Sequence, residues 1–157
     1  MHAYLVPGLR FGPTIVRRLF ERIAPARWDE ATAGDRFTPR EVIAHLADWE
    51  PIMLQRLVSA VEKPGSTVLA YDEAERAIEQ GYAQSDPAQE LDRFEAGRAV
   101  TVRYVEGLDP AVFGNTFIHP ERGPMTVDDQ ANMLLGHDLY HLEQLSGFLG
   151  DKLADVW

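Results

Sequence analysis

The sequence predicts an all-α fold, a four-helix bundle of antiparallel helices with one additional short helix. Three observations support this fold class. Helix-start signals, in which a capping Thr or Asp precedes a proline or acidic residues, recur along the chain. After these signals, apolar residues lie three and four positions apart, which is the period of an amphipathic helix. No segment shows the alternation of apolar and polar residues that indicates a half-buried strand.

The first helix is expected to begin at Gly12-Pro13, because proline is favoured at the first position of a helix. Apolar residues then recur at helical spacing through TIVRRLFERIA, and Pro25 ends the run. The helix predicted in this way is about a dozen residues long.

The second helix has the clearest start signal in the chain. Thr38 is a capping residue, Pro39 occupies the first helical position, and Glu41 is placed to complete a capping box. The helix is expected to run from about residue 39 to 62 and to stop before Pro64-Gly65.

Pro51 lies in the middle of this second helix. Its ring clashes with the carbonyl of Ala47, and its missing N–H leaves that carbonyl without its usual partner. Because the apolar rhythm continues beyond Pro51, we expect a kink near residues 47–51 rather than a break.

The segment from 63 to 85 is mostly polar and is expected to hold one short helix at residues 72–80. Asp86-Pro87 then repeats the combination of cap and proline. The third long helix begins there and is expected to end near Gly107.

Residues 108–125 contain several prolines and glycines and are expected to form an irregular connection. Thr126 and the two aspartates at 128 and 129 then open the last long helix. Gly150 is placed to close it.

Length and composition limit the function classes. A chain of 157 residues is expected to form one domain, spanning residues 1–157. The 25 acidic residues outnumber the 15 Lys and Arg, giving a net charge of -10, so nucleic acid and anionic membranes are not expected as partners. The absence of Cys excludes disulfides and thiolate ligands. With no secretory signal and no long apolar run, a cytoplasmic protein is expected.

The last helix carries two histidines four residues apart, His137 and His141, in the stretch GHDLYHLEQL. Both lie on the predicted inward face, and His45 lies on the inward face of the second helix. Buried imidazoles need partners for their ring nitrogens, and one divalent cation could satisfy all three. Three nitrogen ligands would leave coordination positions open, as in catalytic sites. The alternative is that these are core histidines with ordinary hydrogen-bond partners, because this spacing alone is weak evidence.

Two polar residues near the histidines are candidates for supporting them. Asp48, one turn after His45, could orient an imidazole or act as a base, although an ordinary solvated charge is the simpler interpretation. Gln144 could hydrogen-bond to His141, or it could be a buried amide bonded to the backbone.

Three further residues receive no role in the predicted site. His119 is interpreted as a solvated loop histidine and not as a ligand. Arg98 lies on the apolar face of the third helix, where extension of its head to solvent is favoured over anchoring an anion. Asp138 takes the place of the glutamate of the metalloprotease helix motif, and its shorter side chain argues against that class.

Two stretches resemble the DinB/YfiT-like family of four-helix-bundle proteins. They are FTPREVIAHLADWE and GHDLYHLEQL, and GPMTVDD is similar to the lead-in of the family's last helix. The resemblance covers about residues 10–150. It implies a metal-binding triad, matched here by His45, His137 and His141.

The same resemblance implies a range of activities. Relatives include thiol-S-transferases that use a divalent metal to activate a low-molecular-weight thiol such as bacillithiol or mycothiol, and a mycothiol-dependent isomerase. The expected function is therefore that of a metal-dependent enzyme, thiol-S-transferase-like or hydrolase-like, with Zn, Ni, Mn or Fe, a small-molecule substrate and a possible homodimer. No catalytic residue is assigned. The alternative is a non-catalytic bundle that the metal stabilises, and a di-iron carboxylate site is disfavoured by the spacing of the inward carboxylates.

Overall fold

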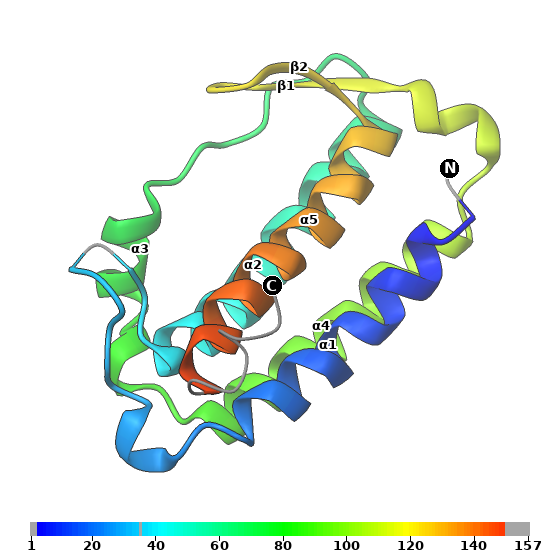
Figure 1. Ribbon diagram of the computed structural model, residues 1–157. Coiled ribbons are helices and arrows are strands. Elements are labelled where there is room, and N and C mark those ends of the chain that lie inside the picture. The colour runs from blue at the N-terminus through cyan, green and yellow to red at the C-terminus, as the bar shows by residue number, and fades with distance from the viewer. Residues whose placement is uncertain (1–2, 35, 150–157) are drawn as a thin grey trace.

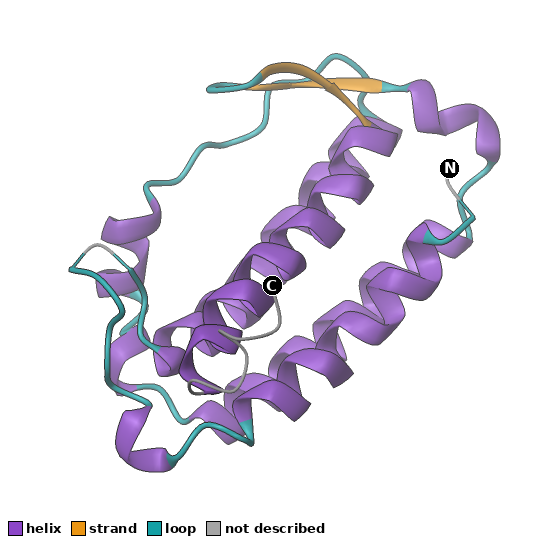
Figure 2. Cartoon of the chain, in the orientation of Figure 1, coloured by secondary structure: helices purple, strands orange, loops and turns teal. Residues whose placement is uncertain are grey.

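The computed structural model describes residues 3–34 and 36–149, and these form a four-helix bundle (Figure 1). The fold class expected from the sequence is confirmed. The four long helices are α1 (Leu5–Phe20), α2 (Pro39–Glu62), α4 (Pro87–Glu106) and α5 (Val127–Ser146). The additional short helix is α3 (Glu73–Glu79), and a small hairpin, β1 (Thr116–His119) with β2 (Gly123–Thr126), lies at one end of the bundle (Figure 2).

The helix neighbours follow a pattern that a simple up-and-down bundle does not have. Both α1 and α2 pack against α4 and α5. The pairs α1/α4 and α2/α5 are antiparallel, as expected, whereas α2 runs in the same direction as α4, and α1 in the same direction as α5 (Figure 1). The reason is the connection from 63 to 86, which contains α3 and returns the chain along the length of the bundle before α4 begins. This connection also forms one wall of the candidate site.

Two predicted helix starts are present in full. Thr38 and Glu41 form a reciprocal capping box at the start of α2, and Thr126 and Asp129 form another at the start of α5. The boundaries of α2, α3 and α4 agree with the sequence prediction to within a residue or two, and α2 continues through Pro51 without a break. Gly150, expected to close the last helix, lies outside the described residues.

The prediction for the first helix was wrong, because α1 begins at Leu5 and contains Pro13. In an α-helix the carbonyl of Leu9 would accept from the N–H of residue 13, which proline lacks. Here the Leu9 carbonyl instead accepts a hydrogen bond from Nη1 of Arg98, at 3.2 Å. A partner from another helix thus compensates for the missing donor, and the helix continues.

The prediction of a wholly irregular connection over 108–125 was also wrong. The segment contains a 3₁₀ turn, Pro110–Gly114, and strand β1, which pairs with β2 in an antiparallel register of Thr116 with Thr126 and His119 with Gly123. Each strand has only four residues, too few for an alternating pattern to be recognised.

A polar layer divides the core of the bundle. One apolar cluster includes Leu9, Leu57 and Phe117, and a second includes Phe20, Leu46 and Phe94. Between them lie buried polar residues of three helices, namely His45, Asp48, Glu50, Arg98, Asp138 and His141. Among the described residues no helix has the length and apolar character needed to cross a membrane.

Candidate metal centre

The three predicted histidines lie together in this polar layer. His45 comes from α2, and His137 and His141 lie one turn apart on α5. Nε2 of His137 lies 2.9 Å from Nε2 of His45 and 3.2 Å from Nε2 of His141. His45 and His141 are buried and His137 is half-buried. Within the described part of the chain, this is the group of His, Cys, Asp and Glu side chains close enough to hold one ion, with ligand atoms within 4.8 Å of one another.

Burial keeps all three imidazoles neutral at neutral pH. It lowers the pKa of His137 to about 3 and that of His141 to about 4, and it lowers the pKa of His45 further still. The neighbouring imidazoles lower the pKa of His45 and His137 in the same direction, because two protonated rings would repel each other. Neutral imidazole is the form that binds a metal.

Gln144 fixes the tautomer of His141. Its Nε2 donates to the carbonyl of Phe37 at 2.8 Å, so its Oε1 is the atom that faces Nδ1 of His141 at 3.1 Å. An amide oxygen only accepts, so Nδ1 of the neutral ring carries the proton. Nε2 of His141 therefore presents a lone pair toward the other two rings, which is the arrangement that a metal ligand requires.

The remaining geometry also fits a metal ion. Two nitrogens bound to zinc at about 2.0–2.1 Å, at angles between 90° and tetrahedral, lie about 2.9–3.4 Å apart. The Nε2 separations of 2.9 and 3.2 Å fall in this range. Nδ1 of His45, by contrast with Nδ1 of His141, is buried and has no hydrogen-bond partner among the described residues, so no described residue fixes the tautomer of the His45 ring. Two of the three pairs of ligand atoms therefore already lie at the separation that one imidazole-bound divalent cation requires, and all three atoms lie within 4.8 Å of one another.

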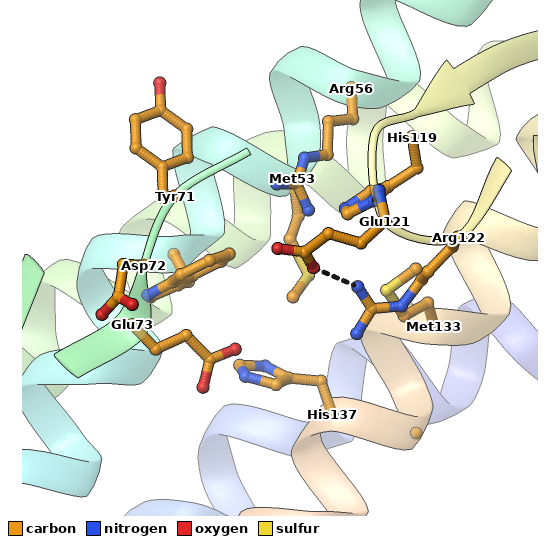
Figure 3. A pocket seen from close by; sticks show the side chains of 12 residues that line it. Met53, Arg56, Tyr71, Asp72, Glu73, His119, Glu121, Arg122, Met133 and His137 are labelled. Atoms are coloured by element: carbon orange, nitrogen blue, oxygen red, sulfur yellow. Dashed lines mark hydrogen bonds and ion pairs between the residues drawn. The ribbon is translucent and has the colours of Figure 1, made fainter. Parts of the chain in front are cut away.

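Two cavities open onto the histidine cluster, each of about 380 Å³. Both are lined by His137 and by Glu73 of α3. One extends toward Arg56 and His119, and the other toward Tyr140. Figure 3 shows the Glu73 carboxylate directed toward the His137 ring across the first cavity. The cluster is therefore accessible from the side of His137.

Sequence reasoning missed Glu73. The only local signal at this position was the start of a short helix, which says nothing about what the helix faces. Its place beside His137 depends on the connection between α2 and α4, whose path the sequence pattern does not determine.

Asp48 is not the solvated charge that the simpler interpretation expected. Its carboxylate is 7% exposed and accepts hydrogen bonds from Nε and Nη2 of Arg76 and from the hydroxyl of Tyr82, at 2.5 to 2.9 Å. It makes no hydrogen bond to a described histidine, although its partner Tyr82 packs edge-on against the His45 ring. Asp48 therefore fastens α3 and the turn after it to α2, which places Glu73 at the cavity.

Arg98 does not extend to solvent, so that interpretation was wrong. The side chain is 2% exposed and forms paired hydrogen bonds with the carboxylates of Glu50 and Asp138, at 2.5 to 2.9 Å. Asp138 is thereby held away from the histidine cluster. The metalloprotease interpretation, already disfavoured, loses its candidate base.

His119 is likewise not a solvated loop residue. It is 2% exposed on β1 and lies at the far end of the first cavity, outside the three-histidine group. The sequence prediction missed its burial because the hairpin itself was missed.

The fold and the site define a four-helix-bundle protein with three converging histidines beneath an open cavity. The chain belongs to the DinB superfamily, whose family model matches residues 9–145. The family resemblance seen in the sequence is thus confirmed.

Among curated proteins, one of Oceanobacillus iheyensis named "Putative metal-dependent hydrolase" is 29% identical over 125 residues, 79% of this chain and 72% of that protein. Among solved structures, YfiT from Bacillus subtilis superposes with a TM-score of 0.86 at 18% identity, covering 92% of this chain and 83% of that chain. It is described as a "probable metal-dependent hydrolase with an unusual four-helix bundle topology".

A mycothiol-dependent maleylpyruvate isomerase has the same bundle, with a TM-score of 0.72 at 14% identity. The match covers 90% of this chain but only 59% of that enzyme, so the isomerase contains a further part that this chain does not match. At these identities both structures show the shared fold and not a shared reaction.

Proposed function

We propose that the protein is a metal-dependent enzyme in which His45, His137 and His141 bind one divalent cation. The observation that carries this proposal is the convergence of three neutral Nε2 atoms on the side of the bundle that opens to the cavities. The name of the Oceanobacillus relative and the description of YfiT support a metal-dependent hydrolase, and the isomerase supports use of a low-molecular-weight thiol.

A divalent cation on three imidazoles lowers the pKa of a bound water or thiol and so supplies a nucleophile at neutral pH. The side chains around it have separate tasks. Gln144 holds His141 with its lone pair directed to the cluster. Glu73, across the cavity from His137, is placed to accept the proton that the water or thiol loses. The apolar faces of Trp49 and Met53 line the same cavity and contact a small-molecule substrate.

The alternative function is a non-catalytic bundle in which the cation joins α2 to α5. Such a site is expected to be capped by a fourth side chain or covered by solid packing. The cavities at His137 and its partial exposure favour the enzyme. Cytoplasmic location and homodimer formation stay predictions, and light scattering of the purified protein measures the latter.

Elemental analysis of purified variants tests the metal site. We expect about one Zn, Ni, Mn or Fe per chain in the parent and its loss in both His45→Ala and His141→Ala. His119→Ala, which removes a buried histidine outside the cluster, keeps the metal. Metal retained in both triad variants would place the site elsewhere.

A second experiment separates the catalytic role from the structural one. The metal-loaded parent is assayed for hydrolysis of small esters and amides and for transfer of bacillithiol, mycothiol and glutathione to an electrophile. Glu73→Gln is expected to keep the metal and lose the activity found. Equal activity of Glu73→Gln and the parent would contradict the role given to Glu73.

A further inference from the structure

The far end of the first cavity holds two buried side chains that the proposed metal chemistry does not use. Arg56 of α2 is 4% exposed and His119 of β1 is 2% exposed. Both line the cavity that has His137 at its other end. Figure 3 shows the two side chains extending into the same region of this cavity.

Arg56 is a buried cation without an anion. Its Nη2 donates to the carbonyl of Leu69 at 3.1 Å, and its guanidinium lies 5.6 Å from the centre of the Trp49 ring. Its Nε is buried with no acceptor, and no carboxylate of the described residues lies within ion-pair distance. Burial and the charge of Arg122 lower the pKa of Arg56, and the more distant carboxylates of Glu121 and Glu73 offset part of this shift.

His119 offers a second unmatched donor. Its Nδ1 accepts from the backbone N–H of Glu121 at 3.3 Å, so in the neutral ring the proton resides on Nε2. Burial and the charge of Arg56 lower the pKa of His119 and keep it neutral. The Nε2–H is buried and has no acceptor among the described residues. Two donors without acceptors, one of them charged, are suited to an anionic acceptor.

The charge of the cavity indicates how many negative charges that acceptor carries. The lining includes two arginines against three carboxylates, namely Arg56, Arg122, Asp72, Glu73 and Glu121. Arg122 is itself paired with Glu121 at 3.5 Å. With a divalent cation on the histidines, the cavity has a net charge of about +1, which a monoanion neutralises and a dianion does not.

We propose that Arg56 and His119 bind the carboxylate of the small molecule on which the metal centre acts. The proposal rests on the proposed function, because the other end of the same molecule must reach His137. The guanidinium fork and the Nε2–H together provide the planar donors that a carboxylate accepts. The substrate class is therefore a monocarboxylate with its reactive group or thiol at the opposite end.

Calorimetric titration of the cobalt(II)-loaded protein tests the subsite. The probes are mercaptopropionate, mercaptobutyrate and mercaptohexanoate, each compared with the mercaptoalcohol of the same length. At least one carboxylate is expected to bind about tenfold more tightly than its alcohol. Equal affinities for every pair, including the absence of measurable binding by both members, would overturn the proposal.

Variants test which residues cause the preference for a carboxylate over the alcohol of the same length. Arg56→Gln, which retains a donor for the Leu69 carbonyl, is expected to abolish it, whereas Arg56→Lys retains part of it. His119→Phe is expected to reduce it about threefold or more. Arg18→Gln, on the exposed side of α1, removes one positive charge outside the cavity and serves as the matched control. A carboxylate preference unchanged in both Arg56→Gln and Arg56→Lys would also overturn the proposal.

The absorption bands of cobalt(II) show whether the histidines bind the metal. They therefore distinguish failure of the carboxylate subsite from failure of the proposed function. Failure of cobalt to bind would overturn both proposals, whereas cobalt bound by the histidines without any carboxylate preference would overturn the subsite alone.

Discussion

Two buried polar clusters lie side by side in this bundle, and they differ in whether the protein completes them. His137 and Asp138 are adjacent in the sequence, yet one belongs to the histidine cluster and the other to the cluster of Arg98, Glu50 and Asp138. Arg98 makes hydrogen bonds to both carboxylates and to the Leu9 carbonyl, which use the full donor capacity of a guanidinium. The histidine cluster contains no cation of its own.

The difference indicates the role of each cluster. A cluster that satisfies its own charges and hydrogen bonds fixes how the helices pack and presents nothing to a ligand. A cluster of neutral nitrogens that face one another is complete only when something external joins them. His45 and His141 are as deeply buried as Arg98, Glu50 and Asp138, so burial alone does not identify a functional site.

The largest predicted effect is on the cluster of Arg98, Glu50 and Asp138. Arg98→Met leaves two carboxylates buried without their partner and is expected to lower the free energy of unfolding by about 3–5 kcal/mol. Urea denaturation monitored by circular dichroism measures this loss. The triple variant Glu50→Leu, Arg98→Met, Asp138→Leu removes the whole cluster and is expected to recover most of it; a loss below about 1 kcal/mol in Arg98→Met would contradict a structural role.

The next largest effect is on the histidine cluster, and it appears only when the metal is present. Zinc at a hundredfold excess over its dissociation constant is expected to stabilise the parent by about 2.7 kcal/mol. His141→Ala should gain nothing from zinc, and thermal melts with and without the ion provide the comparison. Arg98→Met, where it still folds, should keep the gain. Equal stabilisation of His141→Ala and the parent would mean that the zinc binds elsewhere.

Gln144→Leu tests the support of the histidine cluster. Without an acceptor for Nδ1–H, the tautomer of His141 is no longer fixed, and metal affinity is expected to fall about 10- to 100-fold. Competition with a chromophoric chelator measures the affinity. Asp48→Asn is the contrasting variant, because Asp48 bonds to Arg76 and Tyr82 and not to a histidine, and it should change affinity much less. An unchanged affinity in Gln144→Leu would remove Gln144 from the site.

The smallest effects come from two helical glycines. A Cβ on Gly12 would collide with the Asp138 carboxylate, which its pairing with Arg98 holds in place. Gly12→Ala is therefore expected to lower the free energy of unfolding by about 1 kcal/mol, even after the gain in helix propensity of alanine over glycine. Gly136→Ala meets no neighbour within 4 Å and should stabilise by about 0.5–1 kcal/mol. Equal shifts in melting temperature would show that α1 does not depend on this close approach.

Local signals predicted most of the helices and the histidine cluster. Capping boxes act within one turn, so the starts of α2 and α5 could be read directly from Thr38 and Thr126. The inward position of His45, His137 and His141 follows from helical periodicity, which needs only the phase of each helix.

The missed features depend on contacts between distant segments. Pro13 is tolerated within α1 because Arg98, about ninety positions away, satisfies the Leu9 carbonyl. Arg98 is buried because Glu50 and Asp138 flank it, and no local pattern indicates such partners. Glu73, Arg56 and His119 meet in one cavity only because the long connection and the hairpin pack beside α2 and α5.

X-ray absorption spectroscopy of the zinc-loaded protein tests the central claim most directly, since it counts the imidazoles around the ion. The account predicts three imidazole nitrogens at about 2.0–2.1 Å together with at least one oxygen from water. Fewer than three imidazoles, or a first shell made mainly of carboxylate oxygens, would contradict it.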